Sequence, residues 1–322
     1  MQTISFVFWN VENLFNPETG GPRGDFIPEL GWTWDVFDRK LVRLSKVLDA
    51  MEIPDGIDLM GLCEIDDEIV INKFIEKCLN NDEYDYVAAE DFNTNNLDTA
   101  LVYRKDRFEV LDCETLHILN RYPKGDVLIV DLLEKKTGKK IVVIINHWCS
   151  RYNGREFTSS FRCTTAENLQ AYIWQRTLIE PELQLIIAGD FNDHPYSTSL
   201  FEHLGASYDK QAVINQTIDK DVILYNTCWP ALTEENPGTL YYKRNRETSW
   251  SLFDQIIISR ELLINRGWSY RFGSYDIRRK EMSDEFGHPI PSFCWTDNRE
   301  GVIQDGVSDH FPVSIFLDFI EN

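Results

Sequence analysis

The chain has 322 residues, of which 43% are hydrophobic and 26% charged, and its formal net charge is −21. This length allows one large domain or two small ones with a sizeable core. So negative a field slows the approach of polyanions and argues against a tight, processive DNA binder, although a bound divalent metal can invert the field locally.

No composition break, Pro/Gly/Ser-rich linker or repeat divides the chain, so we expect a single domain over residues 1–322. The seven cysteines are scattered without a C-x-x-C pair, which favours reduced thiols over disulfides or zinc. No apolar run is long enough to span a membrane, and the first residues read as a strand. We therefore expect a cytoplasmic protein, or a secreted or periplasmic one if a signal peptide has been trimmed.

The first half of the chain alternates strands with two helices. Residue periodicity predicts helices over 35–51, where an apolar face recurs every three or four residues, and over 67–79. Buried or alternating runs predict the strands. These strands cover residues 4–9, 58–63, 84–89, 99–104, 107–118, 126–133 and 140–146.

The second half begins with a long predicted helix over 156–179, followed by a buried strand over 184–189. Residues 205–250 are polar, aromatic and loop-rich, and two further strands cover 251–258 and 312–319. Residues 273–306 are expected to form a long loop over the mouth of a site. Many strands with few helices predict a layered α/β sandwich, in which two sheets are covered on the outside by helices.

The most informative motif is Gly189-Asp190-Phe191-Asn192, which follows a short apolar run. The pattern predicts a buried strand that delivers two polar side chains at its C-terminal end. Residues two apart on a strand project to the same face, so Asp190 and Asn192 are expected to point into one space. An acid and an amide there suit the activation of a water beside a metal-bound phosphate.

Other predicted strand ends carry polar groups of the same kind. Asp254 stands inside an apolar strand, where a carboxylate is costly unless it is paired or metal-bound. Acids with nearby amides suit Mg²⁺, or Mn²⁺ as a substitute, whereas no Cys/His spacing typical of zinc is present. The remaining strand-end groups are Asn10 with Glu12, Glu64, Asn146-His147 and Ser308-Asp309-His310.

The ordered series of motifs resembles the endonuclease/exonuclease/phosphatase superfamily, in its bacterial branch. The resemblance implies the deoxyribonuclease I-like fold, an α/β (α+β) four-layer sandwich of two mostly antiparallel sheets. Six short motifs in the correct order run from near the first residue to near the last. They are Trp9-Asn10-Val11-Glu12-Asn13-Leu14, Leu62-Cys63-Glu64, Asn146-His147, Gly189-Asp190-Phe191-Asn192, Phe253-Asp254-Gln255-Ile256 and Ser308-Asp309-His310-Phe311-Pro312.

The resemblance also implies roles for the acids and amides. Glu64 would be the main metal ligand, helped by Asn10 and Asp309. Asp190 would orient or deprotonate the attacking water, with Asn192 steadying the water or the phosphate. The reaction would be in-line displacement at phosphorus without a covalent enzyme intermediate.

For the histidines, the resemblance implies contacts to the phosphate. His310 would stabilise developing charge and be oriented by Asp254, as an acid orients the histidine of a hydrolytic triad. His147 would be a second phosphate contact or the leaving-group acid. In the deoxyribonuclease branch a glutamate backs this histidine; here Asp98 is the only nearby acid, and we take it as the partner of His147.

Basic and aromatic residues outside these motifs mark where substrate would lie. Tyr241, Arg244 and Trp250 in a predicted hairpin suit base stacking and phosphate binding, and Arg151 follows His147 closely. A twisted hairpin with solvated charges explains the same pattern.

Three functions remain open from the sequence. The first is a Mg²⁺-dependent phosphodiesterase, in the first place a nuclease, with a nucleic acid or nucleotide as the phosphate-ester substrate and no stable protein partner. The second is a phosphomonoesterase or a phospholipid or inositol-phosphate hydrolase with the same metal site, since substrate choice lies in the loops. The third is a catalytically inactive binding module, which ranks low because no key acid or histidine is missing.

Overall fold

The computed structural model describes residues 2–21, 26–90, 97–118, 126–218, 221–233, 238–244, 247–295, 301–303 and 305–321. The helices are α1 (Trp34–Ala50), α2 (Glu68–Cys78), α3 (Arg155–Ile179) and α4 (Lys210–Asn215). The strands of the first half are β1 (Thr3–Leu14), β2 (Leu59–Ile65), β3 (Tyr84–Glu90), β4 (Leu97–Arg104), β5 (Phe108–Leu116), β6 (Val127–Glu134) and β7 (Lys139–His147). Those of the second half are β8 (Leu185–Asp190), β9 (Ala206–Ser207), β10 (Leu224–Asn226), β11 (Leu240–Arg244), β12 (Glu247–Ser251), β13 (Asp254–Ile258), β14 (Gly267–Tyr270), β15 (Asp276–Ile277), β16 (Phe293–Trp295), β17 (Gly301–Ile303) and β18 (Val313–Ile320).

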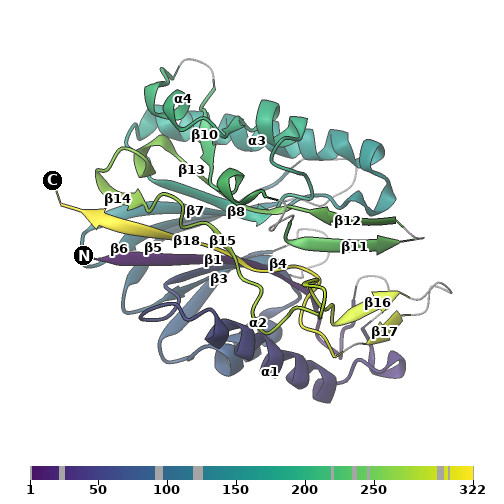
Figure 1. Ribbon diagram of the computed structural model, residues 1–322. Helices are drawn as coiled ribbons and strands as arrows, with labels where there is room; N and C mark the ends of the chain where they lie inside the picture. The colour runs from purple at the N-terminus through teal and green to yellow at the C-terminus, as the bar shows by residue number, and fades with distance from the viewer. Residues whose placement is uncertain are drawn as a thin grey trace.

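The described residues form four layers, as the sequence predicts (Figure 1). One mixed sheet has the order β14-β18-β1-β2-β4-β3, with β15 also paired to β18, and α1 and α2 cover its outer face. The second sheet has the order β5-β6-β7-β8-β13-β10-β9, and α3 and α4 cover it on the opposite side. The ribbons β11–β12 and β16–β17 extend from the same end of the sandwich (Figure 1).

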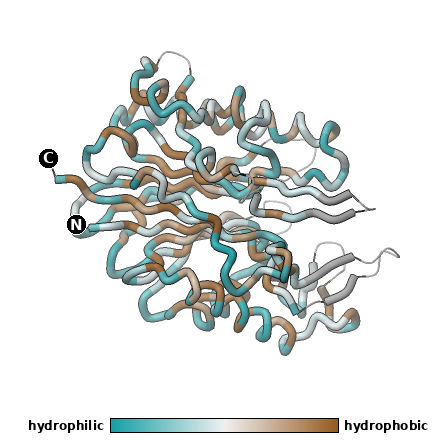
Figure 2. Tube along the Cα trace, viewed as in Figure 1, coloured by the Kyte–Doolittle hydropathy of each residue, from teal (hydrophilic) through white to brown (hydrophobic). Residues whose placement is uncertain are grey.

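The central strands alternate between two cores because successive side chains on a strand face opposite ways. Along β7, Val143 and Ile145 face the other sheet, whereas Val142 and Ile144 pack against α3. Figure 2 shows the hydrophobic chain segments concentrated in the two middle layers. Strands that are apolar on both faces must be covered on both sides, which explains the outer helices. No helix in the described ranges is long and apolar enough to cross a bilayer.

Strand register brings the motif residues to one edge of the sandwich. β7 and β8 run parallel with His147 opposite Asp190, and antiparallel β13 starts with Asp254 opposite Asp190. In the facing sheet, β1 and β2 also run parallel, with Asn10 opposite Cys63. The C-terminal ends of these parallel pairs therefore meet where β13 begins.

Two sequence predictions in the second half need correction. Residues 205–250 contain α4, β9, β10, β11 and most of β12, which a loop-rich reading missed because these elements are only two to six residues long. The predicted strand over 251–258 is two elements, since β12 ends at Ser251 and β13 begins at Asp254. Asp254 is therefore at the start of a strand rather than inside one.

The expected loop over 273–306 contains the short strands β15, β16 and β17. Its described part packs beside the motif edge, because the backbone N–H and the hydroxyl of Ser292 donate to Glu12. The ring of His288 also stacks on Tyr241 of β11, with ring centroids 3.6 Å apart.

Candidate active site

Left-handed backbone conformations gather at the motif edge. Glu12, Asn13, Glu64 and Asn192 have φ angles of 52°, 51°, 63° and 49°. Such conformations cost a non-glycine residue of order 1–3 kcal/mol and persist only where the surroundings enforce them. Both strand β1 and the turn after β8 are thus bent to aim polar side chains at one space.

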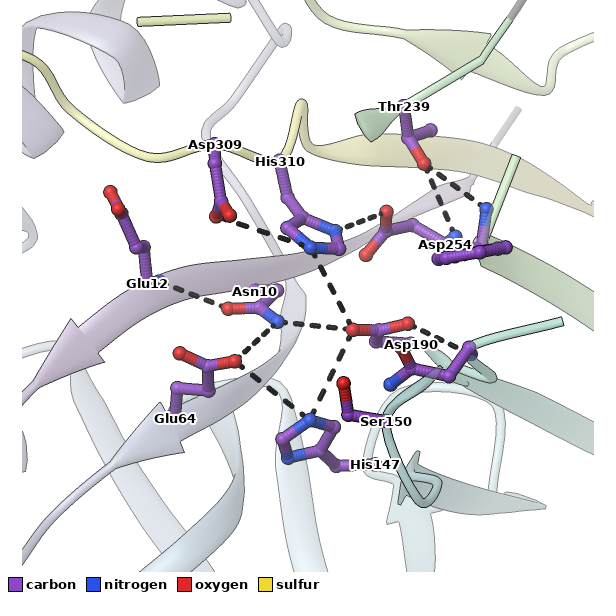
Figure 3. Close-up of polar contacts among 12 residues, drawn as sticks. Asn10, Glu12, Glu64, His147, Ser150, Asp190, Thr239, Asp254, Asp309 and His310 are labelled. Atoms are coloured by element: carbon purple, nitrogen blue, oxygen red, sulfur yellow. Dashed lines mark hydrogen bonds and ion pairs between the residues drawn. The ribbon is translucent and has the colours of Figure 1, made fainter. Parts of the chain in front are cut away.

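Asp190 lies at the centre of the polar cluster drawn in Figure 3. The residue is 2% exposed, and its Oδ1 accepts the backbone N–H of Asn192 at 2.9 Å. Its Oδ2 accepts an amide hydrogen of Asn10 at 3.2 Å. Burial raises the pKa of Asp190 above its ordinary value, against the opposing charges of the two nearby histidines. A carboxylate with a raised pKa in a buried site suits proton transfer from water.

His147 approaches Asp190 from the end of β7. Its Nε2 is 4.0 Å from Asp190 Oδ2, and its Nδ1 is 2.9 Å from Asp98 Oδ1. The structure therefore contains the predicted Asp98–His147 contact. Burial alone would lower the pKa of His147, but the charge and hydrogen bond of Asp98, with further carboxylates, raise it to about 9.

His310 approaches Asp190 from another side (Figure 3). Its Nε2 is 3.8 Å from Asp190 Oδ2, and its Nδ1 is 2.8 Å from Asp254 Oδ2. Burial lowers the pKa of His310, but the charges of Asp254 and Asp190 outweigh this and hold it well above the ordinary value. Asp254 is fully buried, and the hydroxyl of Tyr275 donates to its backbone carbonyl.

Glu64 and Asn10 bound the opposite side of the cluster. Glu64 Oε2 accepts the backbone N–H of Asn13 at 2.7 Å, and its Oε1 accepts an amide hydrogen of Asn10 at 3.0 Å. Asn10 Oδ1 accepts the backbone N–H of Glu12, so the amide oxygen faces away from the acids. In this arrangement Asn10 is a hydrogen-bond donor to two carboxylates, and the predicted role as a metal ligand would require its amide to turn over.

Glu12 and Lys40 form a buried pair behind Asn10. Lys40 is 1% exposed, and its ammonium donates to the carbonyl oxygen of Glu12 and to Ser292 Oγ. Burial raises the pKa of Glu12 to about 8 and lowers that of Lys40 to about 8. Burial is the largest cause of both shifts, and the attraction between the two groups opposes it in each case.

The donor set fits a hard divalent cation. Glu64 and the side chain of Asp309, which is 40% exposed, offer carboxylate oxygens, the ligands that Mg²⁺ and Mn²⁺ prefer. A second group in the described residues, Asp190, Asp254 and His310, has ligand atoms within 4.8 Å of one another. In this second group, however, His310 Nδ1 and Asp254 Oδ2 are already bonded to each other. The carboxylate oxygens of Glu64 and Asp309 are therefore the better ligands for Mg²⁺ or Mn²⁺.

Two other expectations about side chains change in the structure. Asn192 does not share a strand face with Asp190, because β8 ends at Asp190 and the chain turns; its Nδ2 donates to the carbonyl of Trp148. The guanidinium of Arg151 donates from Nε to the carbonyl of Asn192 at 2.7 Å and pairs with Asp193. Arg151 therefore holds the turn after β8, and its expected role in binding substrate stays a prediction.

The predicted substrate residues of the hairpin lie on β11 and β12. Tyr241 and Trp250 pair across the two strands, with ring centroids 5.1 Å apart. Trp250 also stacks on Phe311, next to His310, at 6.2 Å, which connects this aromatic wall to the cluster. Arg244 ends β11, and its side chain falls outside the described part of the chain.

Sequence reasoning missed Lys40 and Ser292 and gave Glu12 no role of its own. One signal was present for Lys40: it stands between Phe37, Leu41 and Leu44, on the apolar face of the predicted helix. A lysine in such a row is costly unless a buried acid faces it. Ser292 carries no comparable signal, because it comes from a polar segment far along the chain.

The chain belongs to the endonuclease/exonuclease/phosphatase family, whose sequence profile matches residues 5–319. Members of this family are metal-dependent hydrolases of phosphoric esters. A search of curated protein sequences finds no match.

Solved structures share the fold. A family member from Bacteroides thetaiotaomicron superposes with a TM-score of 0.58 at 15% identity, covering 99% of each chain. D. rerio TDP2 complexed with single-strand DNA product gives 0.59 at 16% identity, covering 99% of this chain and 100% of that one. A mannosyl-6-phosphatase from B. thetaiotaomicron gives a TM-score of 0.58 at 16% identity, covering 98% of this chain and 100% of that one.

Proposed function

We propose that the protein is a Mg²⁺-dependent phosphodiesterase of the nuclease type, which cleaves by in-line attack of water. The observation that carries this is one buried carboxylate, Asp190, facing two imidazoles that each have an acid behind them. Such a set can activate water on one side of a phosphorus atom and stabilise charge on the phosphoryl and leaving oxygens.

Each residue has a role in this proposal. Asp190 orients and deprotonates the water, and Asn192 supports it through the backbone N–H that binds Asp190 Oδ1. His310, held by Asp254, contacts a phosphoryl oxygen, and His147, held by Asp98, protonates the leaving oxygen. Glu64 and Asp309 would hold the cation, which would supply positive charge to offset that of the phosphate.

A phosphomonoesterase is the second candidate, and the net charge of −21 favours it because a small substrate approaches an acidic protein more readily than a polyanion does. Among the structural neighbours, one is described as a mannosyl-6-phosphatase and another as bound to a single-strand DNA product. The aromatic wall of Tyr241 and Trp250 favours the diester, since aromatic rings stack on bases.

A panel of substrates separates the two. Wild type would be assayed with Mg²⁺ and with excess EDTA on bis-p-nitrophenyl phosphate, p-nitrophenyl phosphate, plasmid DNA, single-stranded RNA and an inositol polyphosphate, with Glu64→Ala as the control. Mg²⁺-dependent cleavage of the diester and a nucleic acid is expected. Phosphate release from monoesters alone would replace the first candidate with the second, and EDTA-resistant cleavage would contradict both.

An inactive binding module makes a different prediction. It would hydrolyse no substrate on the panel. This would hold even if Mg²⁺ raised the melting temperature of wild type and left that of Glu64→Ala unchanged.

A further inference from the structure

Lys40 places a positive charge inside the protein beside the acidic cluster. It lies on the buried face of α1 and is 1% exposed. Burying an ammonium costs several kcal/mol even after relaxation, so its position demands a partner that repays the cost. The partners come from two distant segments, the left-handed turn at Glu12 and the segment that carries Ser292.

The contacts form a closed group. Lys40 Nζ donates to the carbonyl oxygen of Glu12 and to Ser292 Oγ, the latter at 2.7 Å. Ser292 in turn donates its N–H and its hydroxyl to Glu12 Oε2, at 2.6 and 2.9 Å. The Glu12 backbone N–H binds Asn10 Oδ1, and Asn10 binds Glu64 and Asp190. One hydrogen-bonded path therefore joins the lysine to the centre of the site.

The cluster around this hydrogen-bonded path contains more negative than positive groups. The carboxyl groups outnumber the imidazoles three to one, and Lys40 supplies one further positive charge, which acts most on Glu12 and less on Glu64 and Asp309. Without it, the excess negative charge around Glu12 would favour a second cation there. The carboxyl groups counted are those of Glu12, Glu64, Asp98, Asp190, Asp254 and Asp309.

We propose that Lys40 is a fixed internal cation that occupies the Glu12 side of the cluster, so that the site binds one divalent ion, at Glu64, instead of two. This inference rests on the proposed metal-dependent function and makes Lys40 a positioning residue for the metal site. Ser292 completes it by tying the 273–306 segment to Glu12.

Counting bound Mn²⁺ in the absence of substrate tests the inference. Free Mn²⁺ would be measured by electron paramagnetic resonance during titration of wild type, Glu64→Ala, Glu12→Gln, Lys40→Met and the Lys40→Met/Glu12→Gln double variant. Methionine keeps the length of lysine and removes the charge, and glutamine keeps the shape of glutamate. Circular dichroism confirms that each variant is folded.

The expected results are one tight Mn²⁺ per chain in wild type, weaker by at least about tenfold in Glu64→Ala. Lys40→Met should bind two, and the double variant one again. Two tight ions or none in wild type, or a single ion in folded Lys40→Met, would overturn the inference. Should Lys40→Met fail to fold, Glu12→Gln decides: unchanged binding of one ion supports the inference, and loss of an ion overturns it.

These outcomes are separable from the proposed function because binding is counted without turnover. Binding of one Mn²⁺, two in Lys40→Met, with no hydrolysis of any substrate would refute the function and leave the role of Lys40 standing. Mg²⁺-dependent hydrolysis by a wild-type enzyme that holds two ions would support the proposed function and refute the role of Lys40.

Discussion

At the scale of single residues, the site is two acid–histidine pairs aimed at one aspartate. Asp98 and Asp254 each bind the Nδ1 atom of a histidine, at 2.9 and 2.8 Å. A carboxylate on Nδ1 fixes the ring and leaves Nε2 to face the centre. The two Nε2 atoms lie 4.0 and 3.8 Å from Asp190 Oδ2, so both imidazoles converge on the same carboxylate oxygen.

The pKa of His147 in the metal-free protein should depend on Asp98. Asp98→Asn removes the charge that contributes most to raising this pKa, so the pKa should fall well below the wild-type value of about 9. NMR titration of the imidazole protons would measure it. An unchanged pKa would show that Asp98 is not the group that raises the pKa of His147.

The free energy of unfolding should also depend on the protonation of His147. The pKa of His147 is raised from an ordinary 6.5 to about 9, so the folded state binds its proton more tightly than the unfolded state does. The stabilisation is therefore complete below pH 6.5 and is lost as the pH rises through 9. Urea unfolding of the metal-free protein should show this decline in wild type and a smaller one in Asp98→Asn; equal slopes would contradict it.

Asp254→Asn should lower kcat and leave the KM little changed. The asparagine keeps the shape of the side chain but no longer orients and charges the His310 ring, so the loss should be roughly 10²–10⁴-fold. Steady-state kinetics on bis-p-nitrophenyl phosphate would measure it, with Glu52→Gln, at an exposed ion pair with Lys280, as the matched control. A change confined to KM would mean that Asp254 serves substrate binding instead.

At the scale of elements, the close approach of β7 and β8 sets the distance between His147 and Asp190. A Cβ added to Gly189 would meet the carbonyl oxygen of Asn146 at 2.4 Å, which requires the strands to shift. Gly189→Ala should therefore destabilise the fold by about 1–3 kcal/mol, as overpacking does, and reduce kcat. Thermal unfolding with parallel kinetics would test this, and a wild-type melting temperature would contradict it.

Glu64, His147 and Asp190 were predictable because each follows an apolar run and lies at or next to the end of its strand. The same reasoning ends the first strand too early, because β1 continues past Asn10 to Leu14, and His310 precedes β18 instead of ending a strand. It failed where the backbone leaves regular geometry: period-two alternation does not extend past Asp190, and Asn192 lies in a turn. It also failed for Lys40 and Ser292, which are 252 residues apart and meet only in the folded chain.

At the scale of the whole molecule, the net charge of −21 opposes a polyanionic substrate. Added salt screens this repulsion, because the Debye length falls to about 8 Å at physiological ionic strength. If plasmid DNA is a substrate, its kcat/KM should rise as NaCl increases towards roughly 0.15 M at constant Mg²⁺, while that for bis-p-nitrophenyl phosphate changes little. A steep fall with salt would instead reveal a basic binding surface.

The proposed chemistry depends on the Asp190 carboxylate, and the most direct test compares the hydrolysis of bis-p-nitrophenyl phosphate in Mg²⁺ by wild type and by Asp190→Asn. Asparagine preserves the shape and the hydrogen bond from the Asn192 N–H but cannot accept a proton from water. We predict a loss of roughly 10²–10⁴-fold in kcat, with the fold and Mn²⁺ binding at Glu64 retained. Activity within a factor of two or three of wild type would place the chemistry elsewhere.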